Sequence, residues 1–282
     1  MKKTIFCLVA SIGLFFTACD PVCDEHELSG SISADQLKTF CKVELVQENG
    51  VNVNRVRCTT NAPCNVVWSN GVESSTKPTC EFTLFGTGEQ VVSCQALCGN
   101  GELISAEFPV TVDAMSDNYP VDPTWAILCG DGEKVWTWDD SEGGVWGNCG
   151  YMRTPINVWW NDLTAEGIAD QMVGYSYPLD DSGDATMTFV LTGTKVIKSS
   201  GGQGRFTFKM YDKKDITFAI GKLSVTGDGI LFPIRINSGD PGLIVNEYDI
   251  IQLDDDKMQL INAPEGTGDG GEATYWKFKA VK

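Results

Sequence analysis

The sequence contains a single histidine, His26. Serine and cysteine triads need a histidine or another base beside the nucleophile, and His26 lies in a polar stretch near the N-terminus. The cysteines show no paired CxxC spacing, which argues against zinc. The glycine run 201–204 lacks a following helix and a lysine at Walker spacing. The sequence therefore argues against triad hydrolases, zinc proteins and nucleotide-binding enzymes.

Basic residues are also few. The chain has 21 Lys and Arg against 38 Asp and Glu, with a net charge of −17. Such a field repels phosphate backbones, so we expect no nucleic-acid partner and favour neutral or cationic ligands.

Residues 5–16 form the only long apolar run, and it is too short to span a membrane. Two lysines precede it, as in a secretion signal. The run ends in Phe16-Thr17-Ala18-Cys19, which resembles a bacterial lipobox. That resemblance implies a lipoprotein signal peptide over residues 1–19 and lipidation of Cys19. The alternative is an ordinary secretory signal, cleaved after Ala18.

Residues 20–36 are polar and acidic, without apolar periodicity, and we interpret them as a tether. They resemble the acidic sorting segments of surface lipoproteins in glycan-degrading Gram-negative bacteria. The resemblance implies a lipid-anchored protein of the outer membrane, exposed at the cell surface. The alternative is a plain solvated linker.

Residues 37–113 are predicted to form a β-sandwich, because strand-like segments alternate with turn signals. The expected strands are 42–47, 53–59, 65–69, 80–85, 90–98 and 107–112. Val66-Val67-Trp68-Ser69-Asn70-Gly71 and Phe108-Pro109-Val110-Thr111-Val112 resemble PKD-type immunoglobulin-like domains. That resemblance implies a spacer or an interaction module.

Eleven cysteines suit an oxidising compartment. Strand parity puts Cys58 and Cys94 on inward faces, so a bond between them would join the two sheets beneath Trp68. The other pairs that we expect in the chain are Cys64–Cys98, Cys41–Cys80 and Cys129–Cys149. One thiol is left over.

Residues 114–123 read as a linker, and residues 124–282 as a second all-β domain. Its expected strands are 186–191, 205–211, 216–225, 230–236, 247–253, 257–261 and 274–281. A short helix is possible at 163–172. We expect a larger antiparallel β-sandwich or jelly roll, with a lipocalin-like barrel as the alternative.

Residues 125–160 hold six of the eight tryptophans. Trp136 and Trp138 share one face of a strand, so they form either an exposed pair or part of the core. We predict a platform for a neutral glycan built from nearby indoles and polar groups: Trp136, Trp138, Asp139, Trp146, Asn148, Tyr151, Trp159 and Trp160.

The order of lipobox, acidic tether, PKD-like spacer and Trp-rich β-domain resembles the surface glycan-binding lipoproteins of Sus-type polysaccharide utilisation systems. This implies glycan capture beside an outer-membrane glycan importer. A glycoside hydrolase remains possible, with Asp139, Asp140 and Glu142 as the acidic residues. A structural or adhesin-like surface protein is the third class.

No cofactor is expected apart from a possible structural calcium. Asp180, Asp181 and Asp184 are closely spaced and could supply its oxygen ligands. A simple turn explains the same residues.

Overall fold

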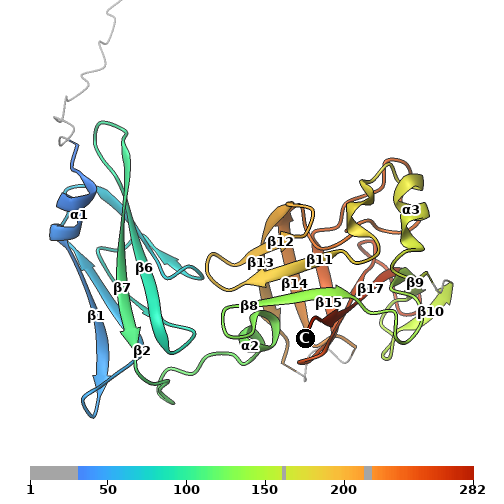
Figure 1. Cartoon of the computed structure of the whole chain (residues 1–282), viewed down its shortest axis with the longest axis horizontal. Helices are drawn as coiled ribbons and strands as arrows, with labels where there is room; N and C mark the ends of the chain where they lie inside the picture. The colour runs from blue at the N-terminus through green and yellow to red at the C-terminus, as the bar shows by residue number, and fades with distance from the viewer. Residues whose placement is uncertain (1–30, 161–162, 213–217) are drawn as a thin grey trace, which may run out of the picture.

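The computed structural model describes residues 31–160, 163–212 and 218–282. The predicted signal peptide, Cys19 and residues 20–30 of the predicted tether lie outside this range. Strands predominate and form two parts that lie side by side in Figure 1, which confirms the all-β prediction in its coarse form. Among the described residues, the helices are all too short or too polar to cross a bilayer.

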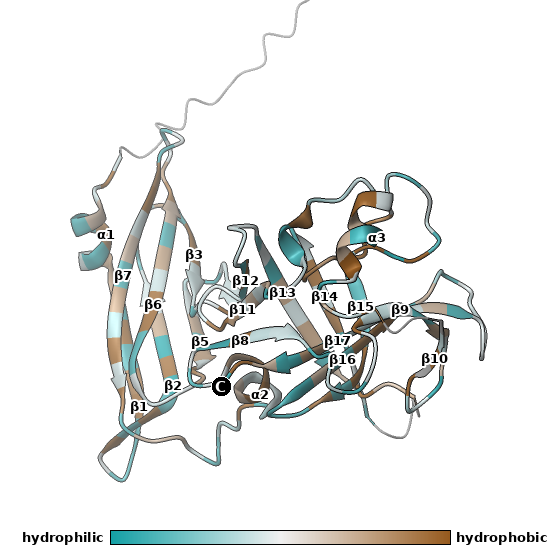
Figure 2. Ribbon diagram, turned by 45° about the vertical axis from the view of Figure 1, so that its right-hand side comes forward, coloured by the Kyte–Doolittle hydropathy of each residue, from teal (hydrophilic) through white to brown (hydrophobic). Residues whose placement is uncertain are grey.

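The N-terminal part is a sandwich of two antiparallel sheets, with strand orders β1-β2-β5 and β4-β3-β6-β7. Hydropathy alternates along β6 and β7 (Figure 2), and the inward side chains of both sheets form one core around Trp68. The strands are β1 Cys41–Glu48, β2 Val51–Thr60, β3 Asn65–Ser69, β4 Ser74–Ser75, β5 Thr79–Thr83, β6 Gly88–Leu97 and β7 Leu103–Val112.

A short helix, α1 (Ala34–Phe40), precedes the sandwich. Ser33 caps it: its hydroxyl accepts from Gln36 N at 3.2 Å, while Gln36 Oε1 accepts from Ser33 N at 2.8 Å. Leu37 is fully buried against the sandwich core. The predicted tether therefore ends earlier than residue 36, because this capping box begins a helix at residue 34.

The C-terminal part is a closed eight-stranded antiparallel barrel. From β11 to β17 each strand pairs with the next along the chain, β8 pairs with β11, and β17 returns to β8 through Phe278 opposite Trp138. The strands are β8 Glu133–Trp138, β11 Thr186–Val190, β12 Lys195–Lys198, β13 Gln203–Met210, β14 Gly221–Gly227, β15 Glu247–Leu253, β16 Lys257–Asn262 and β17 Glu272–Ala280. The closed barrel fits the barrel alternative better than the jelly roll, because β11 to β17 pair in chain order and β17 closes onto β8.

Two further strands extend this sheet beyond the barrel. β9 (Trp146–Gly150) pairs with the first half of β17, whose second half pairs with β8, and β10 (Asn157–Trp160) lies outside β9. The helices α2 (Thr124–Cys129) and α3 (Ile168–Gly174) lie on opposite sides of the barrel in Figure 1. A 3₁₀ turn, η1 (Leu179–Asp181), follows α3.

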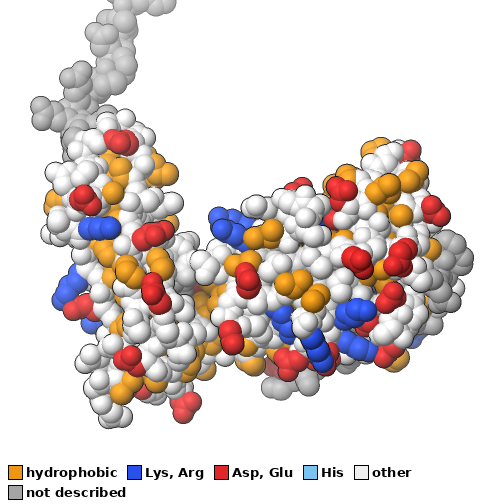
Figure 3. Space-filling view, viewed as in Figure 1, with side chains coloured by type: hydrophobic (Ala, Val, Ile, Leu, Met, Phe, Trp, Pro, Cys, Tyr) orange, Lys and Arg blue, Asp and Glu red, His pale blue; other side chains and the backbone are white. Residues whose placement is uncertain are grey.

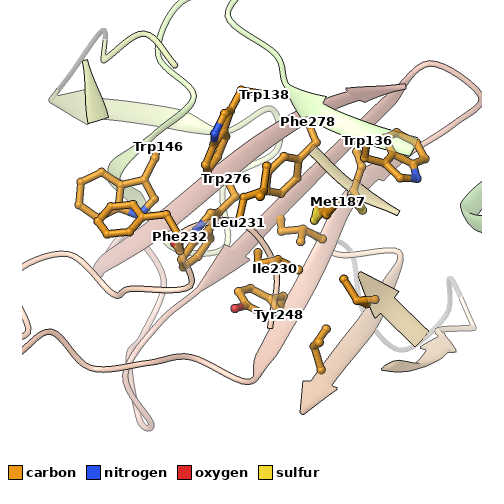
Figure 4. Packing of buried hydrophobic residues seen from close by; sticks show 14 of the residues in the cluster. Trp136, Trp138, Trp146, Met187, Ile230, Leu231, Phe232, Tyr248, Trp276 and Phe278 are labelled. Carbon is orange, nitrogen blue, oxygen red and sulfur yellow. Dashed lines mark hydrogen bonds between the residues drawn. The ribbon is translucent and has the colours of Figure 1, made fainter. Parts of the chain in front are cut away.

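The barrel interior is filled by the chain itself. Residues 228–246, between β14 and β15, contribute Ile230, Leu231 and Phe232, which are fully buried in the main core (Figure 4). We call residues 228–246 the plug. The predicted strand at 230–236 is wrong, because the closed barrel offers this apolar segment space to fill and no strand to pair with along its length.

The two parts meet at aromatic and backbone contacts. Trp125 of α2 packs between Phe85 of the sandwich and Phe208 of the barrel, with ring centroids 5.2 and 4.4 Å away. Gly193 N also donates to Gly71 O at 3.0 Å. Asp and Glu side chains are spread over both parts on the face shown in Figure 3.

All eight cysteines among the described residues are free thiols in the structure. The predicted Cys129–Cys149 pair is wrong, because Cys129 packs in the main barrel core and Cys149 in a separate cluster outside it. The predicted Cys41–Cys80 pair is also wrong, because β2 lies between the strands that carry these residues. Cys64 and Cys98 do lie together, with their Sγ atoms 3.4 Å apart.

Candidate functional site

The tryptophans expected to form an exposed platform are buried. Trp136, Trp138 and Trp146 are each at most 2% exposed, so the prediction that they stack on a ligand at the surface is wrong. The physical reason is barrel closure. β17 and β11 flank β8 on its two edges, and the curvature of the barrel turns the shared face of Trp136 and Trp138 inward.

The indole N–H groups tie the plug and two short helices to the barrel. Trp146 Nε1 donates to Ile234 O at 3.0 Å, and Trp276 Nε1 donates to Phe232 O at 2.9 Å. Trp138 Nε1 donates to Asp181 O in η1 at 2.7 Å, and Trp136 Nε1 to Leu128 O in α2 at 3.0 Å. Figure 4 shows Trp146 and Trp276 around Phe232 of the plug. These indoles therefore stabilise the fold.

The other predicted platform residues are scattered. Trp159 is 46% exposed, while the side chain of Trp160 is not among those described. Asp139 is buried and accepts from Ser141 Oγ at 2.5 Å. Asn148 donates from Nδ2 to Glu272 Oε1 at 3.3 Å. Of the predicted set, only Tyr151 lines the cleft described below.

The acidic residues predicted for catalysis are held in ion pairs or turns. Glu142 contacts Lys257 at 2.5 Å and Asp140 contacts Lys279 at 3.4 Å. Asp139 is buried in its own turn, whereas Asp140 and Glu142 lie at the surface.

The candidate calcium ligands also separate. Asp181 is buried and pairs with Lys198 Nζ at 2.7 Å, whereas Asp180 and Asp184 face solvent. The calcium prediction fails here because Lys198 neutralises the central carboxylate. Within the described ranges, no group of three or more His, Cys, Asp or Glu side chains is placed to hold a metal ion.

A different site lies on the outer face of the barrel. A cleft of about 740 Å³ opens over β14, β15 and the end of β16, next to the turn after β9. We call it the outer cleft. Its lining residues are Tyr151, Met152, Tyr211, Phe218, Lys222, Glu247, Tyr248, Asp249, Asn262, Ala263 and Glu265.

Strand alternation explains why polar groups gather there. In β15, Tyr248 and Ile250 point into the barrel, so Glu247 and Asp249 share the outer face. Lys222 of β14 is the cross-strand partner of Asp249. Three charged side chains on two adjacent strands thus lie within reach of one ligand.

Aromatic side chains form the apolar side of the outer cleft. Tyr151 and Phe218 meet edge to face, with ring centroids 5.2 Å apart. Thr154 Oγ1 donates to Phe218 O at 2.7 Å and fixes that segment against the turn after β9. Both rings pack on the outer cluster that also contains Cys149 and Tyr275.

Hydrogen bonds orient the charged groups. The Tyr151 hydroxyl donates to Asp249 Oδ2 at 2.9 Å, and Lys222 Nζ contacts Glu247 Oε2 at 2.9 Å. Burial raises the pKa of Asp249 above its ordinary value, against the lowering effects of the Tyr151 hydroxyl and the Lys222 ammonium. Burial and the neighbouring Asp249 raise the pKa of Tyr151, so its hydroxyl remains a donor.

Asn262 adds an unpaired acceptor at the cleft. Its Nδ2 donates to Glu247 O at 2.9 Å, which fixes the orientation of the amide. Its Oδ1 is buried and has no hydrogen-bond partner among the described residues. A buried acceptor without a donor costs free energy.

Sequence reasoning found Tyr151 but missed Phe218, Lys222, Asp249 and Asn262. Alternation in 247–250 does place two carboxylates on one outer face, which is a usable signal. Nothing in the sequence shows that β14, β16 and the turn after β9 meet beside them.

Comparisons with known proteins identify no family for the chain. No protein-family model matches it, and no curated protein matches it. Among solved structures, the PKD1 domain of the Vibrio cholerae metalloprotease PrtV is similar at 17% identity, with a TM-score of 0.22. The match covers 26% of this chain and 95% of that domain. A likeness this weak supports no functional conclusion.

Proposed function

We propose that the protein captures a neutral, hydroxyl-rich ligand, such as a segment of a glycan chain, in the outer cleft. In this proposal the protein is an outer-membrane lipoprotein, held at the cell surface by a lipid on Cys19. An outer-membrane glycan importer would be its functional partner.

The observation that carries the proposal is the pairing of an aromatic wall with oriented polar groups. Tyr151 and Phe218 offer apolar faces to the C–H groups of a sugar ring. Asp249 offers an acceptor to its hydroxyls, and Lys222 offers a donor. A site with a few placed polar groups beside aromatic side chains is typical of small-ligand recognition.

Polysaccharide binding by the mature chain tests this proposal directly. A panel of neutral polysaccharides is cast into native gels, and retardation of the wild-type chain identifies the ligand. Phe218→Ala should then weaken binding by about 1–3 kcal/mol, which is roughly 5- to 150-fold in Kd, because it removes one wall of the outer cleft. Asp249→Asn should weaken it as well, since a carboxylate accepts hydroxyl donors more strongly than an amide.

The matched control is Trp159→Ala, which removes an exposed indole that does not line the outer cleft. We expect this variant to bind like the wild type. Each variant's melting temperature shows whether a loss of binding reflects unfolding. If Trp159→Ala loses binding while Phe218→Ala binds fully, the ligand binds outside the outer cleft. If no member of the panel retards the wild type, the glycan proposal fails and an adhesin-like role becomes the better explanation.

Glycoside hydrolysis is the second candidate, favoured by one observation at the same site. Burial raises the pKa of Asp249, while the neighbouring Glu247 is held as an ion pair with Lys222. A carboxylic acid of raised pKa beside a second carboxyl group is the arrangement that glycosidases use. Release of reducing ends from a bound polysaccharide, abolished in Asp249→Asn, would establish it; binding without release favours capture alone.

A further inference from the structure

The sandwich places two cysteines directly opposite each other in one sheet. Cys58 of β2 and Cys80 of β5 are cross-strand partners in the antiparallel ladder. Directly opposed residues have Cα atoms about 4.5–5.5 Å apart and side chains on the same face. Disulfides span Cα separations of about 4.4–6.8 Å, so this pair satisfies their geometry.

A second pair faces across the sandwich core. Cys41 begins β1 in one sheet, and Cys94 lies in β6 of the other sheet. Both side chains pack into the same core cluster. Burial raises the pKa of the Cys94 thiol, and Cys41, which lies within hydrogen-bonding reach of it, raises it further.

The third pair lies beside the core. The Sγ atoms of Cys64 and Cys98 are 3.4 Å apart, so bond formation needs only a small approach of the two side chains.

Two other pairings fail on geometry, and a third leaves two thiols unpaired. The strand order β1-β2-β5 separates Cys41 from Cys80 by two strand spacings, about 9.5 Å, which exceeds the reach of a disulfide. Cys41 stands opposite Thr60, two residues from Cys58, and this diagonal separation of about 7–8 Å is also too long. A Cys58–Cys94 bond would leave Cys41 and Cys80 as half-buried thiols that cannot reach each other.

We propose that the exported protein carries three disulfides in its sandwich, Cys58–Cys80, Cys41–Cys94 and Cys64–Cys98, and that Cys129 and Cys149 of the barrel remain thiols. The Cys41–Cys94 bond is then the covalent link between the two sheets. The proposal concerns the fold of the sandwich and is independent of what the outer cleft binds.

The chemistry is thiol–disulfide exchange. Each pair gives up two protons and two electrons to the disulfide of an extracytoplasmic oxidoreductase, which leaves as a dithiol. Burial and the neighbouring Cys80 raise the pKa of Cys58 to about 12, and burial raises that of Cys129 to about 12. Thiols in this condition exchange slowly, so the bonds form before the core closes.

Peptide mapping of the full chain, exported to an oxidising compartment, tests the proposal. Free thiols are blocked with N-ethylmaleimide in acidic denaturant, and the protein is digested without reduction for mass spectrometry. We expect three linked peptides at the stated pairs and a blocking group on Cys129 and Cys149. A Cys58–Cys94 or Cys41–Cys80 peptide, alkylation of the six sandwich cysteines, or a metal ion retained by them would overturn it.

Two double variants sharpen the result. Replacing Cys58 and Cys94 together with Ser should leave Cys41 and Cys80 alkylated, since neither can reach the other. Recovery of a Cys41–Cys80 peptide from that variant would contradict the proposed geometry. The matched control replaces Cys129 and Cys149 with Ser and should leave all three linkages in place. The wild-type map decides the question even where a variant does not fold.

Discussion

Asp181 and Lys198 form an ion pair of 2.7 Å inside the barrel, where their side chains are 4% and 3% exposed. Asp181 Oδ2 also accepts from the Tyr177 hydroxyl and from Phe232 N, each at 2.8 Å. One carboxylate oxygen therefore joins η1, β12 and the plug. Because of these contacts, the acidic turn η1 packs into the interior of the barrel.

Removing one member of this pair should destabilise the protein strongly. Asp181→Asn leaves the Lys198 ammonium buried without a counter-charge, which we expect to lower the free energy of unfolding by about 3–5 kcal/mol. Urea denaturation measures the change. The control is Asp269→Asn, which breaks an exposed contact with Arg153 and should cost less than about 1 kcal/mol. If both variants lose the same free energy of unfolding, the buried ion pair contributes no more to stability than the exposed one.

The indole N–H groups should matter for stability rather than for binding. Trp276→Phe keeps an aromatic ring but leaves Phe232 O buried without its donor, at a cost of about 1–3 kcal/mol. Trp159→Phe, at an exposed position, should change the free energy of unfolding by less than about 0.5 kcal/mol. Ligand binding by folded Trp276→Phe should match the wild type. If Trp276→Phe keeps full stability but no longer binds the ligand, the tryptophans take part in binding.

Stability should depend on pH through Asp249. Burial raises the pKa of Asp249 in the folded chain above its unfolded value of about 3.9, so folding favours the protonated carboxyl. Its stabilising contribution is complete below the unfolded pKa and is lost as the pH rises through the folded pKa. The wild type should therefore lose stability relative to Asp249→Asn between acidic and neutral pH. Urea denaturation at a series of pH values measures the difference.

Tyr151→Phe serves as the internal check on this pH dependence. The Tyr151 hydroxyl lowers the pKa of Asp249 by donating to it, so its removal should make the loss of stability larger and extend it to higher pH. A wild type that gains stability relative to Asp249→Asn as the pH rises would show that the carboxylate is stabilised by its partners instead.

Membrane attachment should depend on Cys19, since residues 16–19 resemble a lipobox. Cys19→Ala should release the chain from the membrane fraction, because a thiol at this position would carry the lipid. Fractionation and intact-mass measurement together detect the change. Cys23→Ala, four residues further on, is the matched control and should remain acylated and membrane-bound. Membrane association of Cys19→Ala without any acyl group would reject the anchor.

The strands of the sandwich could be predicted from the sequence because each follows local rules. Apolar residues alternate along β6, and turn residues separate it from its neighbours, so its position follows from nearby residues alone. α1 was missed although Ser33 and Gln36 form a recognisable capping box. Seven residues are too few for helical periodicity to show.

The outer cleft could be predicted only in part. The sequence places Tyr151 in the predicted ligand platform because it lies beside the tryptophans, and this residue does line the cleft. Its partners Phe218, Lys222 and Asp249 lie between 67 and 98 residues further along the chain. Contacts over such separations depend on strand order, which alternation does not encode.

The sequence by itself determined that the chain is mostly β, that Trp136 and Trp138 share a strand face, and that residues 230–236 are apolar enough to be buried. Only the tertiary structure decided which face is inside. Closure between β8 and β17 encloses the tryptophans, fills the barrel with the plug and leaves Asp249 on the outer wall. The physical reason is that alternation along a strand shows which side chains share a face, but it does not show which of the two faces is buried. Packing against strands distant in the sequence decides which face belongs to the core.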